Sequence, residues 1–446
     1  MEKGISGRII KIMLFLLLFL AATLYLIMEF APGLIGQGLI SPVSGAIYME
    51  EVATPAEYAP ETHSVFYTGK QGGYFYATKD GVTCYGSDHH SKSASSFNMT
   101  APILTGNGNC TAIWEHMGNT VSIFSDQGLL YQKQLEESIL HVSVNPKGYS
   151  NIITKNNDQA QGQDHDRDRY RYRIDSYNPS GTLILGGPDE NYNIFPFTSA
   201  ISNDGRILAV SYVDVNGVTP DSIIQFSYLN ISEGRDYADG VFAAIAKNPD
   251  EMISQLHFMD DNKLLVVSDK QIACVDVNQN PSAYTWSIPL GNKLLHLAID
   301  EGKGFTIALG DPILNQPSVT PNLIQYYTMD QTLQWSYEAK APISLINVGF
   351  NGVLVVEAGN VTALQKGQPI WQYPAPQDLR QIFFYQSLHQ VLQVTDTKAS
   401  ILSAVKASVQ ASGAPSTPLP GSDTALPHTD TNIDSTADSE PDLASD

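Results

Sequence analysis

The stretch AISNDGRILAVSYV, residues 200–213, contains the pattern that decides the fold. The polar turn Asn-Asp-Gly at residues 203–205 leads into a run of apolar and β-branched residues, which is typical of a strand entered through a tight turn. Residues 260–267 and 350–356 repeat this arrangement, and helical periodicity is scarce from residue 60 to 405. We therefore expect an all-β fold.

The short apolar runs recur as a unit of four strands, with a polar turn before the second strand and often a tryptophan in the fourth. One candidate helical stretch, residues 240–247, is short and equally consistent with a strand. The turn markers Gly205, Asn262, Gly304 and Gly352 lie 57, 42 and 48 residues apart, and Trp286, Trp335 and Trp371 lie 49 and 36 residues apart. Four-stranded repeats of roughly 40–50 residues are typical of propeller blades.

The repeat predicts a single β-propeller over residues 61–405. Units begin near residues 65, 106, 139, 191, 251, 291, 341 and 376. The first and last units look incomplete, and in a propeller they would share one blade and close the ring. This gives about seven blades, with six or eight as alternatives. A pair of β-sandwich domains is the competing architecture, but no linker divides the middle of the chain.

An apolar stretch near the start predicts a membrane anchor. Residues 12–28 carry no charge, and three cationic residues precede them at positions 3, 8 and 11. At about 1.5 Å per helical residue, residues 9–30 can cross a hydrocarbon core of roughly 30 Å. No Ala-x-Ala cleavage site follows, so an uncleaved signal anchor is favoured over a signal peptide. The anchor residues are Ile12, Leu16, Leu20, Leu24 and Met28.

This anchor sets the topology at the cell membrane. Positive charge before the helix places residues 1–8 in the cytoplasm and the rest of the chain outside, in a single pass. Residues 31–60 are rich in Gly, Pro and small residues, and we expect a flexible stalk there. Residues 406–446 are acidic and rich in Ser, Thr and Pro, which predicts a disordered tail.

Charge and cysteine content exclude some classes of function. The formal net charge of −21 disfavours nucleic-acid binding, which needs clustered Lys and Arg. Three cysteines, Cys84, Cys110 and Cys274, are too few for a disulfide framework. Cys84 and Cys110 either pair across neighbouring hairpins or lie buried in strands as small hydrophobic residues, and the second interpretation is favoured.

Metal ligation has weak candidates. Asp164, Asp166 and Asp168 alternate and would point the same way on a strand, as a hard cation requires. Neighbouring arginines compete for these carboxylates, so a solvated loop is the favoured interpretation. The loop with Asp88, His89 and His90 lacks further zinc ligands at suitable spacing. The alternating Arg and Tyr of residues 169–173 suit the wet face of a strand, with a ligand groove as the alternative.

No catalytic motif occurs, which predicts a non-enzymatic protein without a cofactor. A nucleophile elbow, a phosphate loop, H-E-x-x-H and S-x-x-K are all missing from the sequence. The alternative is an envelope enzyme, a hydrolase or quinoprotein-like dehydrogenase, with its site in the propeller channel. Linear sequence does not reveal carboxylates that meet across such a channel.

Residues 200–211 and the Ala-Thr-Lys-Asp-Gly-Val stretch at 77–82 resemble the blades of WD-repeat-like propellers. Together with the anchor and stalk, the chain resembles the domain-of-unknown-function 5711 family of Gram-positive bacteria over roughly residues 8–405. That resemblance implies a membrane-anchored propeller and carries over no site residues. The later units, which end in Trp, also resemble the quinoprotein-like propellers of envelope assembly factors.

The function expected from these features is binding or scaffolding at the cell envelope. Propellers present a broad face of loops, and this chain has long loops at residues 86–109, 155–169 and 311–321. The expected partner is an envelope protein or a wall polymer, with the membrane contacted through the N-terminal helix.

Overall fold

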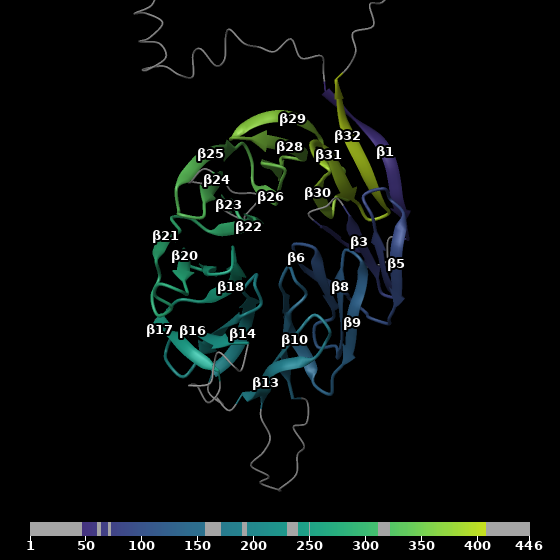
Figure 1. The fold of residues 1–446 in the computed structure, drawn as a ribbon. Helices are drawn as coiled ribbons and strands as arrows, with labels where there is room; N and C mark the ends of the chain where they lie inside the picture. Colours follow the sequence, from purple (N-terminus) through teal and green to yellow (C-terminus); the bar gives the residue numbers. More distant parts are fainter. Residues whose placement is uncertain are drawn as a thin grey trace, which may run out of the picture. The chain divides into compact units, whose positions relative to one another are not determined.

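The protein forms a ring of eight antiparallel sheets with four strands each (Figure 1). This computed structural model describes residues 47–59, 64–69, 73–156, 171–189, 194–229, 240–248, 250–310 and 322–406. Within these residues every regular element is a strand, which confirms the all-β fold and the single propeller.

The blades are numbered here from the first strand that follows β1. Blades 1 to 4 consist of β2 Val65–Thr68, β3 Tyr74–Thr78, β4 Gly81–Tyr85 and β5 Ser91–Ser96; β6 Ile103–Asn107, β7 Cys110–Trp114, β8 Thr120–Ser125 and β9 Gly128–Gln134; β10 Ser138–Val144, β11 Ser150–Lys155, β12 Tyr172–Tyr177 and β13 Leu183–Asp189; and β14 Ile194–Ile201, β15 Ile207–Asp214, β16 Asp221–Tyr228 and β17 Val241–Asn248.

Blades 5 to 8 continue around the ring. They consist of β18 Ile253–Phe258, β19 Lys263–Ser268, β20 Gln271–Asp276 and β21 Trp286–Pro289; β22 Leu294–Asp300, β23 Gly304–Leu309, β24 Asn322–Thr328 and β25 Leu333–Ala339; β26 Ile343–Gly349, β27 Gly352–Glu357, β28 Asn360–Gln365 and β29 Gln368–Pro374; and β30 Gln381–Tyr385, β31 Ser387–Val394, β32 Lys398–Lys406 and β1 Ile47–Glu57.

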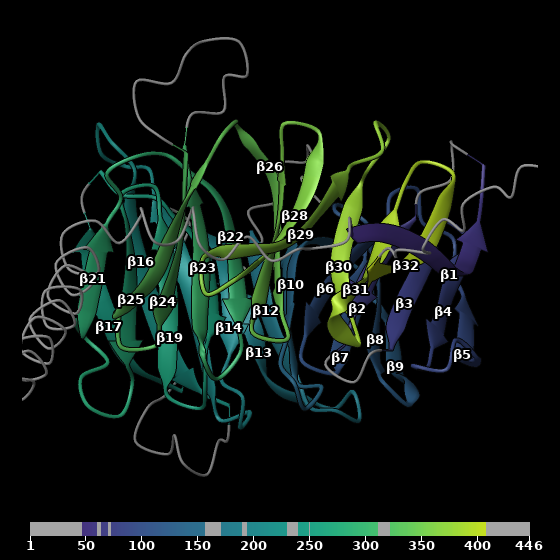
Figure 2. The same cartoon turned by 90° about the horizontal axis from the view of Figure 1, so that it is seen from above.

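The first strand of each blade lies toward the centre of the ring and the fourth at its rim (Figure 1). Seen from the side, the sheets of neighbouring blades stand next to one another (Figure 2). Trp286, Trp335 and Trp371 all lie on fourth strands, as the repeat predicted. Residues 240–247, the ambiguous stretch, fall almost entirely in strand β17.

Blade 8 combines the two ends of the described chain. Strand β1 pairs antiparallel with β32, with Glu51 opposite Leu402. Residues 47–57 therefore belong to the propeller and not to the stalk predicted over residues 31–60. Their sequence, IYMEEVATPAE, contains acidic residues and Pro55, which argue against an interior strand. An outermost strand tolerates both, because one of its edges faces away from the sheet.

The same strand corrects the predicted blade count. The first unit is a complete sheet of its own, β2 to β5, and the last unit is completed by β1. The two therefore do not share a blade, and the ring has eight blades and not about seven. Strand β2 has four residues, so its unit looked incomplete in the sequence.

The hydrophobic core lies between neighbouring blades. All eight residues of β15 are buried, because the sheet packs against a neighbour on each face. One core cluster joins Ile207 and Ile224 of blade 4 to Leu264 and Val266 of blade 5. A strand buried on both faces needs apolar residues at successive positions, which explains the continuous runs that marked the repeat.

Cys84, Cys110 and Cys274 are free thiols on strands β4, β7 and β20. Each is buried, with an exposed fraction of 3% or less. The interpretation as small hydrophobic strand residues is confirmed, and Cys84 does not pair with Cys110.

The predicted cytoplasmic segment of residues 1–8, the anchor helix of residues 9–30, the stalk as far as residue 46 and the tail beyond residue 406 fall outside the described residues. Within the ranges that the structure describes, no helix long and apolar enough to cross a membrane occurs.

Candidate functional site

Five of the innermost strands carry a β-bulge near their start. The strands are β10, β14, β18, β22 and β26, and the residues skipped in their pairing are Leu140, Phe197, Ser254, Leu295 and Ser344. A bulge inserts one residue and locally redirects the side chains of its strand. At this position Phe197 is 46% exposed although it lies inside a strand.

A hydrogen bond crosses the centre of the ring. The backbone N–H of Gly108, in the β6–β7 turn of blade 2, donates to Glu301 Oε1 of blade 6 at 2.9 Å. In a ring of eight, blades 2 and 6 lie opposite each other. The Tyr67 hydroxyl of blade 1 donates to the Gly108 carbonyl at 3.1 Å. Burial raises the pKa of Tyr67, and the negative charge of Glu301 raises it further. We call this set of contacts the bridge.

Gly108 is suited to the bridge by its backbone conformation. Its φ of +64° lies in the left-handed region, which a side chain disfavours. A Cβ atom at this position would also lie 2.9 Å from Pro146 Cβ, closer than side chains pack. The turn of blade 2 can therefore approach both blade 3 and Glu301.

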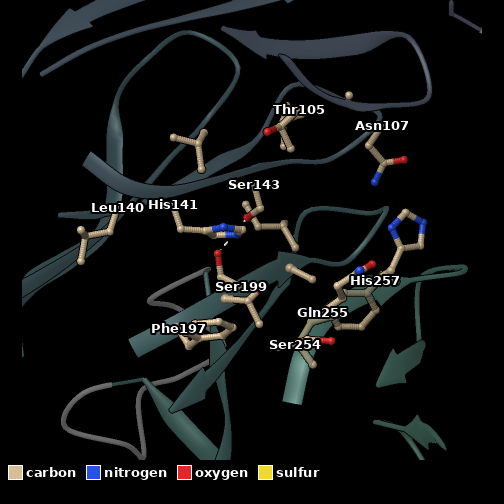
Figure 3. A pocket seen from close by; sticks show the side chains of 18 residues that line it. Thr105, Asn107, Leu140, His141, Ser143, Phe197, Ser199, Ser254, Gln255 and His257 are labelled. Atoms are coloured by element: carbon tan, nitrogen blue, oxygen red, sulfur yellow. Dashed lines mark hydrogen bonds between the residues drawn. The ribbon is translucent and has the colours of Figure 1, made fainter. Parts of the chain in front are cut away.

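Two cavities lie in the ring, one on the side of blades 2 to 5 and one on the other side. The first cavity has a volume of about 430 Å³ and is lined by residues of β6, β10, β14 and β18 (Figure 3). Its polar lining side chains are Thr105, Asn107, His141, Ser143, Thr198, Ser199, Ser254, Gln255 and His257. No Asp, Glu, Lys or Arg is among the described residues that line it.

Some of these polar groups bond to one another. The hydroxyls of Ser143 and Ser199 lie 3.0 Å apart, and Trp114 Nε1 donates to Thr105 Oγ1 at 3.0 Å. Other groups have no protein partner in the described part of the chain: Asn107 Oδ1 and His141 Nε2 are buried and accept or donate no hydrogen bond there. Buried polar atoms of this kind are rare in folded proteins and need an explanation.

His141 is held neutral by its surroundings. Burial lowers the pKa of its imidazole to about 4, and a hydrogen bond with the Ser199 backbone opposes this only in part. The His141 imidazole therefore carries no formal charge at neutral pH.

The second cavity has a volume of about 610 Å³ and a different chemistry. Residues of β2, β22, β26 and β30, together with the turns that follow them, line it. Its charged side chains are Asp300, Glu301 and Lys303. Lys303 Nζ lies 3.3 Å from Asp300 Oδ1 and 2.9 Å from Asn351 Oδ1 of blade 7, while Glu301 belongs to the bridge. These charges connect neighbouring or opposite blades.

The residues singled out in the sequence lie elsewhere. Asp164, Asp166 and Asp168 fall outside the described residues. Within the ranges that the structure describes, no three His, Cys, Asp or Glu residues could hold a metal ion. His89 stacks on the Tyr385 ring of blade 8 with 5.5 Å between ring centres, whereas His90 Nδ1 lies 3.4 Å from Asp88. The two histidines thus have different partners.

The described part of the Arg–Tyr stretch makes local contacts. The Arg171 guanidinium lies over the Phe195 ring at 4.7 Å. Arg173 Nε and Asp175 Oδ2 form an ion pair of 2.7 Å between two residues that lie two positions apart on β12. Neither arginine lines the two cavities described above.

Reasoning from the sequence missed the residues of both cavities. They come from strands far apart in the chain, and no motif joins them. A usable signal was present in the first strand of each unit. Residues 138–144, SILHVSV, mix His and Ser with apolar residues, whereas second strands such as β19, KLLVVS, and β27, GVLVVE, are largely apolar. Polar positions recurring on first strands indicate a polar centre of the ring.

A family model identifies the relatives of this chain. The model for a family of unknown function, DUF5711, matches residues 50–403. The chain belongs to this family. The match begins within β1 and ends within β32, so DUF5711 corresponds to the complete ring of eight blades. No curated protein matches the sequence.

Several solved structures resemble this DUF5711 propeller at low sequence identity. BamB from Moraxella catarrhalis is 12% identical, with 80% of this chain and 100% of that chain covered and a TM-score of 0.46. Sqt1 from Saccharomyces cerevisiae is 10% identical, with 82% and 100% covered and a TM-score of 0.47. AztD from Citrobacter koseri is 13% identical, with 70% and 86% covered and a TM-score of 0.44.

Proposed function

We propose that this protein is a membrane-tethered, extracytoplasmic propeller that binds a component of the cell envelope without transforming it. The observation that carries the proposal is the first cavity. It combines a volume of about 430 Å³, within the usual range of about 300–1,000 Å³ for ligand sites, with the exposed polar side chains of Ser254 and Gln255. Their hydroxyl and amide groups can hydrogen-bond to a ligand in the cavity.

The charges of the ring favour binding over catalysis. Acid–base catalysis needs a titrating group within hydrogen-bond reach of the reacting atom. Asp300 contacts Lys303, and Glu301 accepts the Gly108 N–H of the bridge. Both carboxylates thus have structural contacts, and both lie in the cavity opposite to the one with unsatisfied polar atoms.

The tether follows from the predicted anchor and from the position of β1. If the anchor ends at residue 30 and β1 begins at Ile47, residues 31–46 connect them. Fully extended, sixteen residues reach at most about 55 Å. The start of β1 would therefore lie within that distance of the outer face of the cell membrane. There the propeller would act on an envelope protein or a wall polymer.

Fractionation and protease protection of the full-length chain test the tether. We expect the chain in the membrane fraction, and we expect protease added to intact spheroplasts to digest the propeller. A soluble protein, or a propeller that is protected until the membrane is broken, would refute the proposed localisation.

The binding role is tested with envelope extracts and a variant of the second cavity. The full-length chain should retain an envelope component, and the double variant Asp300→Asn, Glu301→Gln should retain it equally well if it is folded. Consumption of that component by the native chain and not by the double variant would instead establish the enzyme alternative.

A further inference from the structure

We infer that the first cavity binds a neutral sugar of one or two rings. The inference rests on the proposed function, in which the ring binds an envelope component, and it specifies the chemical class recognised in this cavity. Three properties of the cavity lead to it: its lack of Asp, Glu, Lys and Arg side chains, its exposed hydrogen-bonding groups and its aromatic side chain.

The charge of the cavity excludes ionic ligands. Its described lining contains no Asp, Glu, Lys or Arg side chain, and burial holds His141 neutral at pH 7. An anion entering it would lose hydration without meeting a cation, inside a protein of net charge −21. A cation would meet no carboxylate. A neutral ligand avoids both penalties.

The hydrogen-bonding groups indicate a ligand that carries hydroxyls. Gln255 and Ser254 lie exposed on β18, and the Gln255 amide both donates and accepts. The Ser254 hydroxyl donates to the Val267 carbonyl at 3.3 Å and can still accept a hydrogen bond. Asn107 Oδ1 and His141 Nε2 are buried without a protein partner in the described residues. A sugar hydroxyl both donates and accepts, so it can bond to either exposed group.

Phe197 supplies the apolar contact that a sugar ring needs. The bulge in β14 leaves this ring 46% exposed, and Figure 3 places it among the side chains that line the cavity. One face of a pyranose carries C–H groups, which pack on an aromatic face while the hydroxyls at the ring edge bond to polar groups. The volume of about 430 Å³ limits the ligand to a small molecule or the end of a chain.

Binding to the full-length chain in detergent micelles tests the inference. Probes are three neutral disaccharides (diacetylchitobiose, maltose and cellobiose), glucuronic acid as an anion, glucosamine as a cation and trialanine as a neutral peptide. Saturation-transfer NMR detects contact, and titration calorimetry measures affinity. We expect at least one disaccharide to bind, and the charged sugars and the peptide to bind at least tenfold more weakly.

A matched pair of variants locates the site. Phe197→Ala should weaken sugar binding about fivefold to tenfold, the value of a lost aromatic contact. Phe350→Ala removes a ring of similar exposure, 41%, from the second cavity and should leave affinity unchanged. Equal melting temperatures of both variants and the native chain exclude an effect of misfolding. A sugar affinity that falls with Phe350→Ala and not with Phe197→Ala overturns the inference.

Other outcomes separate this inference from the proposed function. Binding of trialanine but of no sugar, sensitive to Phe197→Ala, overturns the sugar class and retains a binding propeller. Failure of all sugars, while the chain still retains an envelope component, also overturns the inference and leaves the proposed function standing. Failure of the sugars together with failure to retain any envelope component overturns both.

Discussion

The two sides of the ring differ in how the chain builds them and in what they enclose. Blades 2 to 5 come from one continuous stretch, residues 103–289, and line a cavity without Asp, Glu, Lys or Arg among its described residues. Blades 1, 6, 7 and 8 come from both ends of the described chain and line a cavity with three charged side chains. The bridge from Gly108 to Glu301 links blade 2 on one side with blade 6 on the other.

The side built from both chain ends contains the closure of the ring. Tyr74 of blade 1 stacks on Tyr85 with 4.9 Å between ring centres and meets Tyr385 of blade 8 edge to face at 6.2 Å. Blade 8 itself depends on β1. Charged groups on this side, such as Lys303 and Glu301, join blades, whereas the continuous side lines the first cavity, for which we propose a ligand.

The largest expected effect is the loss of closure. Deletion of residues 47–57 would expose the edge of β32 and uncover part of its core, and we expect it to cost more than about 4 kcal/mol of the free energy of unfolding. Hydrogen exchange should show lost protection in β30 to β32 and retained protection in β18 to β21. Deletion of residues 408–446 serves as the control. Equal loss of protection in β30 to β32 and in β18 to β21 would show that pairing with β1 does not stabilise one side of the ring more than the other.

The next effect concerns pH on the continuous side. Burial holds the pKa of His141 at about 4 in the folded chain, below its usual 6.5. The unfolded chain binds a proton first as pH falls, so this group destabilises the fold progressively between pH 6.5 and 4. At about 1.4 kcal/mol per pKa unit the effect is at most about 3.5 kcal/mol.

The variant His141→Gln should flatten this part of the stability profile, measured by urea unfolding at several pH values. His90→Gln, at a side chain 85% exposed, should leave the profile of the native chain unchanged. An unchanged slope in His141→Gln would contradict a neutral buried imidazole in the first cavity.

A smaller effect is expected at the bridge. Glu301→Ala removes the acceptor of the Gly108 N–H, and we expect a loss of about 1.5–3 kcal/mol, the range for hydrogen bonds to charged groups. Glu301→Gln keeps an oxygen acceptor and should lose less. Amide exchange at Gly108 should accelerate in Glu301→Ala. Exchange that stays at the native rate would mean that the two sides are joined by other contacts.

The smallest effect is expected at the exposed charge of the second cavity. Lys303 is 51% exposed and pairs with Asp300, so Lys303→Met should cost at most about 0.5 kcal/mol. Salt at 1 M screens the pair, and native and variant chains should then unfold at nearly the same urea concentration. A loss of more than 1 kcal/mol that persists in salt would show that this pair contributes to closure as much as the bridge does.

Much of the fold could be predicted because its signal is local. Each predicted unit start lies within five residues of the first strand of a blade. The turn residues and the apolar runs of the second strands recur along the chain, and both follow from backbone geometry and burial of each sheet. Strand β1 was not predicted, because Pro55 and the acidic residues of this strand suit the outermost strand of a sheet. Such a strand resembles a loop in sequence.

The sites of the ring could not be predicted in the same way. Nothing near Gly108 in the chain indicates Glu301, which is 193 residues away. In the sequence Phe197 looks like an ordinary strand residue, and only the structure shows that the bulge in β14 exposes its side chain. The acidic cluster of residues 164–168 and the histidine-containing cluster of residues 88–90, in contrast, stand out in the sequence because their members are neighbours in the chain.

The sequence by itself determined that the chain is β-structured, that it repeats in four-stranded units and that these close into one ring, because periodicity and turns are properties of adjacent residues. Tertiary structure decided the number of blades, the strand that closes the ring, the bridge and the division into a charged and an uncharged cavity. Each of these depends on which distant residues meet in space, and that is set by the geometry of the closed ring and not by any local pattern.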